Sequence, residues 1–95
     1  MNTNRVENYT DKIEGGKSVR FQALGREGRI HLEGTGPIVM ETSVDGVTYD
    51  TVEHDITFKN GVAVKPVSFY IGDHVRISAT TLTKVIVNYN DLKTN

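Results

Sequence analysis

The chain has 95 residues, of which 37% are hydrophobic and 24% charged, and its formal net charge is −1. This length supports one hydrophobic core, and the composition is typical of a soluble globular domain. The absence of cysteine excludes a disulfide framework or a thiolate site. The pI is near 6.3, so the chain lacks the excess of basic residues that is typical of nucleic-acid binders.

The first 16 residues predict an extended arm ahead of the fold. Their apolar anchors are Val6, Tyr9 and Ile13, and Gly15-Gly16 ends the segment with a flexible hinge. We therefore expect a chain that starts at Lys17 to stay folded but to lose docking or oligomerisation. The predicted boundaries are residues 1–16 for the arm, 17–92 for a β-sandwich domain and 93–95 for a C-terminal tail.

From residue 17 onward, apolar and polar residues alternate with a period of two, as in strands with one buried face. No segment keeps apolar residues at helical spacing over three turns. Short strands separated by Gly, Asp and Asn turns predict an all-β fold, a single antiparallel β-sandwich of seven or eight strands, jelly-roll-like or immunoglobulin-like. The alternating runs cover residues 18–23, 29–33, 38–44, 47–52, 56–59, 62–65, 67–71, 74–78 and 84–89.

Three positions mark turns or interruptions. Asp45-Gly46 and Asn60-Gly61 each separate two β-rich runs, and both pairs tolerate the positive φ angles of a type I′ hairpin turn. Pro66 lies where the apolar positions change from even to odd numbers. Because proline has no amide hydrogen, we expect a bulge, a bend or a change of sheet there.

The inward positions of these runs predict one shared core, since the two sheets of a sandwich bring alternate residues together. The predicted members are Phe21, Ile30, Leu32, Ile38, Met40, Phe58, Val75, Ile77, Val85 and Val87.

The chain lacks the sequence patterns of common catalytic and cofactor sites. His31, His54 and His74 lie in separate runs without metal-ligand spacing, and we interpret them as outward-facing residues. No serine sits in a strand-to-helix elbow, and no glycine-rich loop opens a helix. We therefore expect no enzymatic activity, no cofactor and no metal site. Four carboxylates, Asp45, Asp50, Glu53 and Asp55, could still converge around Ca²⁺ or act as a glycosidase pair, although neither spacing is specific.

Two stretches carry a resemblance: GTGPIVMETSVDGVTYDTV over residues 34–52 and YIGDHVRISATTLTKVIVNYN over residues 70–90. They resemble the small β-sandwich virion proteins of tailed bacteriophages, of the capsid auxiliary, decoration or head-fibre type, with the crAss-like group as a candidate. A Ser-x-Asp-Gly turn, an aromatic residue, a Gly-Asp turn, a Val-Arg-Ile strand and a closing Val-x-Val strand carry the likeness. Here these are Ser43, Asp45, Gly46, Tyr49, Gly72, Asp73, Val75, Arg76, Ile77, Val85 and Val87, within residues 18–90.

The resemblance implies a structural protein of the virion, made in the host cytoplasm, whose partners are other copies of itself and a capsid or tail protein. We expect neither nucleic acid nor a membrane as a partner, since no apolar run approaches the roughly 20 residues that cross a bilayer. The alternative is a carbohydrate-binding module that presents the loops GREG and SVDGVTY to a glycan. Tyr49 stands where many of these sequences carry Trp, which weakens this alternative because sugar binding relies on exposed aromatic platforms.

The charges are distributed unevenly. Residues 37–58, the acidic hairpin, carry −5 without any Lys or Arg, so that the net charge of −1 leaves +4 for the rest. We interpret this as a head-to-tail contact with basic positions of a neighbouring copy, namely Arg20, Arg26, Arg29, Lys65 or Arg76. The simpler alternative is a solvated hairpin whose acids keep it soluble. The candidate assembly contacts are Arg5, Tyr9, Glu41, Asp50, Glu53 and Asp55.

Overall fold

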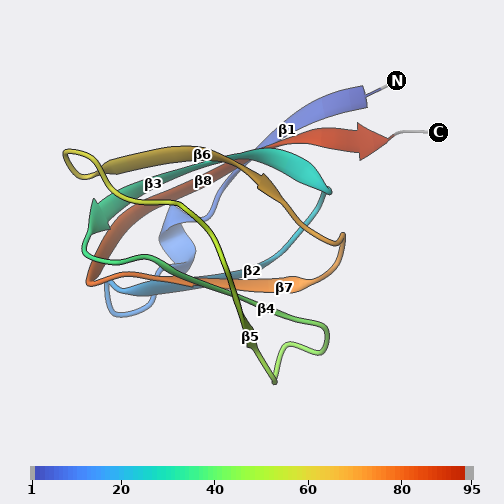
Figure 1. The fold of residues 1–95 in the computed structure, drawn as a ribbon. Coiled ribbons are helices and arrows are strands. Elements are labelled where there is room, and N and C mark those ends of the chain that lie inside the picture. The colour runs from blue at the N-terminus through green and yellow to red at the C-terminus, as the bar shows by residue number, and fades with distance from the viewer. Residues whose placement is uncertain (1, 94–95) are drawn as a thin grey trace.

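The computed structural model describes residues 2–93 as an all-β protein, and it describes the side chains of residues 4–90 (Figure 1). Eight strands and one short 3₁₀ helix follow one another along the chain, which confirms the predicted antiparallel β-sandwich. The elements are β1 (Asn2–Asn8), η1 (Thr10–Lys12), β2 (Ser18–Gln22), β3 (Glu27–Thr35), β4 (Val39–Ser43), β5 (Asp50–Val52), β6 (Val62–Ser68), β7 (His74–Ser78) and β8 (Thr81–Lys93).

The strands form two four-stranded antiparallel sheets. Sheet A has the order β1-β8-β3-β6, and sheet B has the order β2-β7-β4-β5. Figure 1 shows sheet A above sheet B, with the termini close together at one end. The pairings are nested, because β1 pairs with β8, β2 with β7, β3 with β6 and β4 with β5. This nesting is the topology of a jelly roll, and it decides between the two sandwich types that the sequence left open.

The core lies between the sheets and follows the predicted alternation. Ile30 and Leu32 in β3 and Val75 and Ile77 in β7 have no exposed surface, whereas their neighbours along each strand face outward. Nine of the ten predicted core residues are buried, and Phe58 is half-buried against the core. The core also contains residues that were not on the predicted list: Tyr9, Val19, Ala23, Ile56, Ala63, Phe69, Leu82 and Tyr89.

The N-terminal segment differs from the predicted arm. Strand β1 pairs antiparallel with β8 from Asn2 to Asn8, so it is an edge strand of sheet A. Tyr9 is buried: its ring stacks on Phe21 with centroids 4.3 Å apart, and its hydroxyl lies 2.9 Å from that of Tyr89. Ile13 also packs against the core, so the segment is attached through Tyr9 and Ile13 although its apolar pattern is weak.

The C-terminal boundary also differs from the prediction. Strand β8 extends to Lys93, the first residue of the predicted tail, while residues 94 and 95 lie outside the described part of the chain.

The prediction of a bulge, a bend or a change of sheet at Pro66 is wrong. Strand β6 pairs with β3 in one unbroken register, in which Pro66 lies opposite Arg29. Hydrogen bonds at Gly34–Gly61 and at Phe69–Arg26 flank this ladder. Since hydrogen-bonded pairs alternate with non-bonded ones, Pro66 falls at a non-bonded position and its missing amide faces the open edge.

Strand β6 keeps one parity throughout, and this explains the apparent change at Pro66. Ala63 is buried and Val67 packs against the core, whereas Val62 and Val64 point outward and are exposed. The valines before Pro66 therefore belong to the outer surface, although their apolar character suggested the core.

The second hairpin signal is confirmed in detail. Asn60 and Gly61 have φ angles of 55° and 79°, and Lys59 and Val62 exchange backbone hydrogen bonds of 2.8 and 3.1 Å. Positive φ at both central residues is the mark of a type I′ turn. Of the predicted run 56–59, only Lys59 makes a β-bridge, so this run forms no separate strand.

Candidate functional site

The outer surface of sheet A presents a contiguous grid of side chains, here called the sheet A face. Residues that alternate with the buried core positions point away from the core, and the strand register places them side by side. They lie in three rows across the strands: Val6, Asn88, Arg29 and Pro66 in the first; Asn8, Ile86, His31 and Val64 in the second; Lys84, Glu33 and Val62 in the third.

Apolar side chains are distributed over the sheet A face. Val6 is 62% exposed, Val64 41% and Val62 37%, while Ile86 is half-buried at the centre. A hollow of about 190 Å³ opens at the centre, lined by Arg29, His31, Val64, Ile86 and Asn88 together with Ile30. Exposed apolar side chains around a hollow make this face a candidate surface for another molecule to cover.

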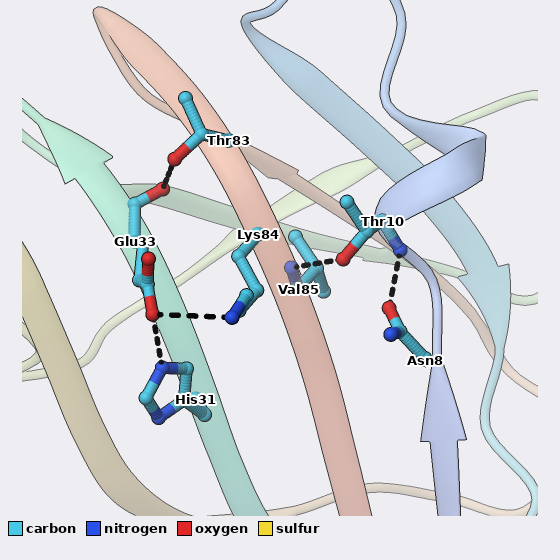
Figure 2. Close-up of polar contacts among 7 residues, drawn as sticks. All are labelled: Asn8, Thr10, His31, Glu33, Thr83, Lys84 and Val85. Atoms are coloured by element: carbon cyan, nitrogen blue, oxygen red, sulfur yellow. Dashed lines mark hydrogen bonds and ion pairs between the residues drawn. The ribbon is translucent and has the colours of Figure 1, made fainter.

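A charged cluster lies at one end of this face, where β3 and β8 run side by side (Figure 2). The Glu33 carboxylate lies 2.9 Å from Nε2 of His31 and 3.6 Å from Nζ of Lys84. The hydrogen bond from His31, with the charge of Lys84, lowers the pKa of Glu33 below its usual range. The third row therefore carries the ionised Glu33 with the Lys84 ammonium beside it, and the first row carries the cation Arg29.

The corner after β1 is fixed by a second group of contacts in Figure 2. The Thr10 amide donates to Asn8 Oδ1 over 2.9 Å, and the Val85 amide donates to Thr10 Oγ1 over 3.2 Å. The Tyr9 amide between them donates to the Val85 carbonyl over 2.8 Å. These bonds end the pairing of β1 with β8 and turn Tyr9 inward.

The outer surface of sheet B carries the exposed Val39 and two ion pairs. Arg76 makes two hydrogen bonds to the Glu41 carboxylate, of 2.9 and 3.0 Å, which lower the pKa of Glu41. The Arg76 guanidinium carbon lies 4.1 Å from the centroid of the Tyr49 ring, so it covers one side of that ring. Arg20 pairs with Glu14 at 3.1 Å. The charges on this surface thus find partners within the chain.

The structure separates the six candidate assembly contacts. Arg5 pairs with Glu7 at 2.6 Å on β1, and Tyr9 is buried, so its side chain is unavailable to a partner. Glu41 is bound to Arg76 on sheet B. The others, Asp50, Glu53 and Asp55, are exposed in or just after β5, at the opposite edge of the sandwich from β1.

The acidic residues do not gather into a metal site. Among the described side chains of residues 4–90, no three His, Cys, Asp or Glu come together in a way that could hold a metal ion. Asp55 instead lies 3.9 Å from Nζ of Lys65, on the neighbouring strand β6. Asp45 accepts hydrogen bonds from the backbone amides of Val47 and Thr48 in its own loop.

His54 has a structural role that the sequence did not indicate. Its Nδ1 accepts from the Ile56 amide over 3.0 Å, so Nε2 carries the proton and donates to the Ile38 carbonyl over 2.8 Å. The half-buried ring thereby ties the segment after β5 to the start of β4. A half-buried position in a connecting segment gives no periodic signal in the sequence.

The connection between β4 and β5 is a hairpin, but it is longer than the predicted two-residue turn. It spans residues 44–49, and positive φ occurs at Gly46, with a φ of 79°, but not at Asp45. The Asp45 carboxylate instead accepts hydrogen bonds from the amides of Val47 and Thr48 and from Ser43 Oγ, at 2.8 to 2.9 Å. Led by the Thr48 amide, these bonds lower the pKa of Asp45 to about 2.

This capping makes the stability of the loop dependent on pH. A carboxyl whose pKa is lower in the folded chain than in the unfolded chain, where it is about 3.9, stabilises the fold above that value. We expect Asp45→Ala to reduce the unfolding free energy at neutral pH, and the difference from wild type to shrink as pH falls from about 4 to about 2. Urea unfolding across this range measures the difference, with the exposed Asp50→Ala as control. A difference that does not change with pH would contradict this assignment.

Three comparisons with known proteins gave no match: no protein-family model, no curated protein and no solved structure is similar to the chain. No helix among the described residues is long and apolar enough to cross a membrane.

Proposed function

We propose that this protein is a non-enzymatic structural component of a bacteriophage particle, a capsid auxiliary, decoration or head-fibre protein that works through protein–protein contacts. The sequence resemblance is the reason for proposing a bacteriophage particle. The sheet A face is the reason for proposing that the protein works through protein–protein contacts. A jelly roll is used by viral capsid proteins and also by lectins, so the fold alone does not choose the function.

The observation that carries this proposal is the set of exposed apolar side chains on sheet A. The sheet A face combines exposed Val6, Val62 and Val64 with a hollow beside the half-buried Ile86. On the outer surface of sheet B, Val39 is exposed, and Arg20 and Arg76 pair with Glu14 and Glu41. Desolvating apolar groups favours association. A protein partner is therefore expected on sheet A.

Mass spectrometry of purified particles tests the proposed location. The protein should remain in particles after banding in a density gradient and a high-salt wash, at a fixed ratio to the major capsid protein. Abundant host cytoplasmic proteins in the same preparation provide the baseline for contamination. Recovery at or below this baseline would end the proposal.

The acidic hairpin makes a separate prediction about association rate. The triple variant Asp50→Asn, Glu53→Gln, Asp55→Asn should assemble more slowly, and its assembly should depend less on salt, because exposed charges mainly steer encounter and are screened over about 8 Å at physiological ionic strength. Light scattering across a salt series measures this rate.

A matched control removes the same charge elsewhere, through Asp11→Asn, Glu14→Gln and Glu27→Gln at exposed positions. Equal assembly of wild type and the hairpin variant at low and high salt would leave the solvated hairpin as the better interpretation.

The second candidate function is carbohydrate binding, and one feature favours it. A hollow of about 510 Å³ on sheet B is lined by Tyr49, His74, Gln22, Arg20, Glu14 and Lys12, with Phe21 and Gly46. Hydrogen-bonding side chains beside an aromatic ring suit a sugar. A glycan array followed by calorimetry on the isolated monomer tests this candidate, and binding that Tyr49→Ala abolishes would support it over the structural role.

A further inference from the structure

The three rows of the sheet A face form a self-complementary pattern. The first row carries the cation Arg29, and the third row carries the anion Glu33 beside Lys84. Arg29 lies two residues before His31 in β3, and Glu33 lies two residues after it. At the edge strand β6, Pro66 ends the first row and Val62 ends the third. The second row, between them, contains the apolar residues Ile86 and Val64 on either side of His31. If the order of the rows is reversed, Arg29 takes the place of Glu33 and Pro66 takes the place of Val62. A reversed copy therefore presents an opposite charge to Arg29 and to Glu33, and an apolar side chain to Pro66 and to Val62.

We propose that a second copy of this chain docks face to face on the sheet A face, related by a two-fold axis along the row Asn8–Ile86–His31–Val64. This inference deepens the proposed function, on which it rests for its biological setting, by naming the partner of that surface. In an isologous contact, each surface patch meets its own copy. Packed sheets lie about 10 Å apart with strands aligned within about 30°, so each strand crosses its own counterpart in the opposite direction.

The rotation brings the first row of one copy onto the third row of the other. Arg29 then faces Glu33 of the second copy, and Pro66 faces Val62 of the second copy. The second row meets itself, so that Ile86 and Val64 each contact their own counterparts across the axis. Apolar contacts supply the affinity, and the two symmetry-related charge pairs fix the register.

Charge reversal tests the register directly. In a dimer of Arg29→Glu chains, the introduced carboxylate faces Glu33, and in a dimer of Glu33→Arg chains, the introduced guanidinium faces Arg29. Sedimentation velocity on the full chain should therefore show wild-type dimers and a dissociation constant raised at least about tenfold in either variant, because opposed like charges are costly. An equimolar mixture of the two variants should form a one-to-one heterodimer at near wild-type affinity. In it, the carboxylate introduced at position 29 faces the guanidinium introduced at position 33, and the remaining Glu33 of one chain faces the remaining Arg29 of the other.

Arg20→Glu provides the control, because Arg20 is an exposed arginine on sheet B. It should leave the dimer unchanged, and thermal unfolding should show that all variants are folded; Val64→Lys offers a second disruption outside the charged cluster. A wild-type chain that stays monomeric, an equal effect of Arg20→Glu and Arg29→Glu, or a mixture without heterodimers would overturn the proposal.

The outcomes also separate this inference from the proposed function. Dimers with the expected charge dependence, in a protein that is absent from purified particles, would refute the particle role alone. Presence in particles with association that ignores Arg29 and Glu33 would refute the docking geometry alone.

Discussion

A chain that starts at Lys17 is expected to lose the cooperative unfolding transition of the full-length protein. The shortened chain lacks β1, which pairs with β8 along its length, and it also lacks Tyr9. Truncating a buried aromatic side chain alone costs about 3–5 kcal/mol. A domain of this size has a total stability of the order of 5–15 kcal/mol, so the loss of the strand and its anchor together removes most of it.

Urea unfolding followed by circular dichroism measures this loss. The point variant Tyr9→Ala isolates the anchor from the strand, and Tyr70→Ala, at a site that is 81% exposed, is its matched control. The newly exposed edge of β8 should also promote aggregation of the shortened chain. If the shortened chain unfolds at the wild-type midpoint, the boundary at residue 17 is correct and β1 contributes little.

The second large effect is expected from Ile77→Ala. Ile77 has no exposed surface, and it lies between Val19 of β2 and Met40 of β4 at the centre of sheet B. Removing its side chain loses apolar burial and leaves a cavity that close-packed neighbours fill only in part. The expected cost is about 2–5 kcal/mol of unfolding free energy.

Ile71→Ala is the matched control, because Ile71 is 59% exposed in the connection before β7. Its effect should stay within about 0.5 kcal/mol, as for most surface substitutions. Both values come from the midpoint and slope of the same denaturant titration. Equal midpoints for the two variants would remove Ile77 from the core.

The strands with one buried face could be predicted because their alternation is local. In β3 and β7, each inward residue is flanked by outward polar ones, so Ile30, Leu32, Val75 and Ile77 were correctly assigned to the core. Edge strands give a weaker signal. The outer valines of β6 made the apolar positions change parity at Pro66 and so suggested an interruption, and β1 carries so few apolar residues that only pairing with β8 identifies it as a strand.

The sheet A face could not be predicted, because it depends on long-range register. Parity alone indicates that Arg29, His31 and Glu33 share one side of β3. Their neighbours across the sheet, Ile86 and Val64, come from strands far away in the sequence. The nested pairing determines these neighbours, and the sequence left that topology open. The assembly contacts predicted from the N-terminal arm and the acidic hairpin therefore included Tyr9, which is buried, and Glu41, which Arg76 binds.

Cysteine cross-linking tests most directly whether copies associate through the sheet A face. The chain has no cysteine, so Val64→Cys introduces a single thiol, which the two-fold axis places opposite its own counterpart. A thiol-reactive cross-linker that spans about 10 Å matches the spacing of packed sheets. Val47→Cys, in a loop position that is 82% exposed, is the control. The account predicts rapid formation of covalent dimers at position 64 and little at position 47, whereas equal yields, or no dimer at position 64, would contradict it.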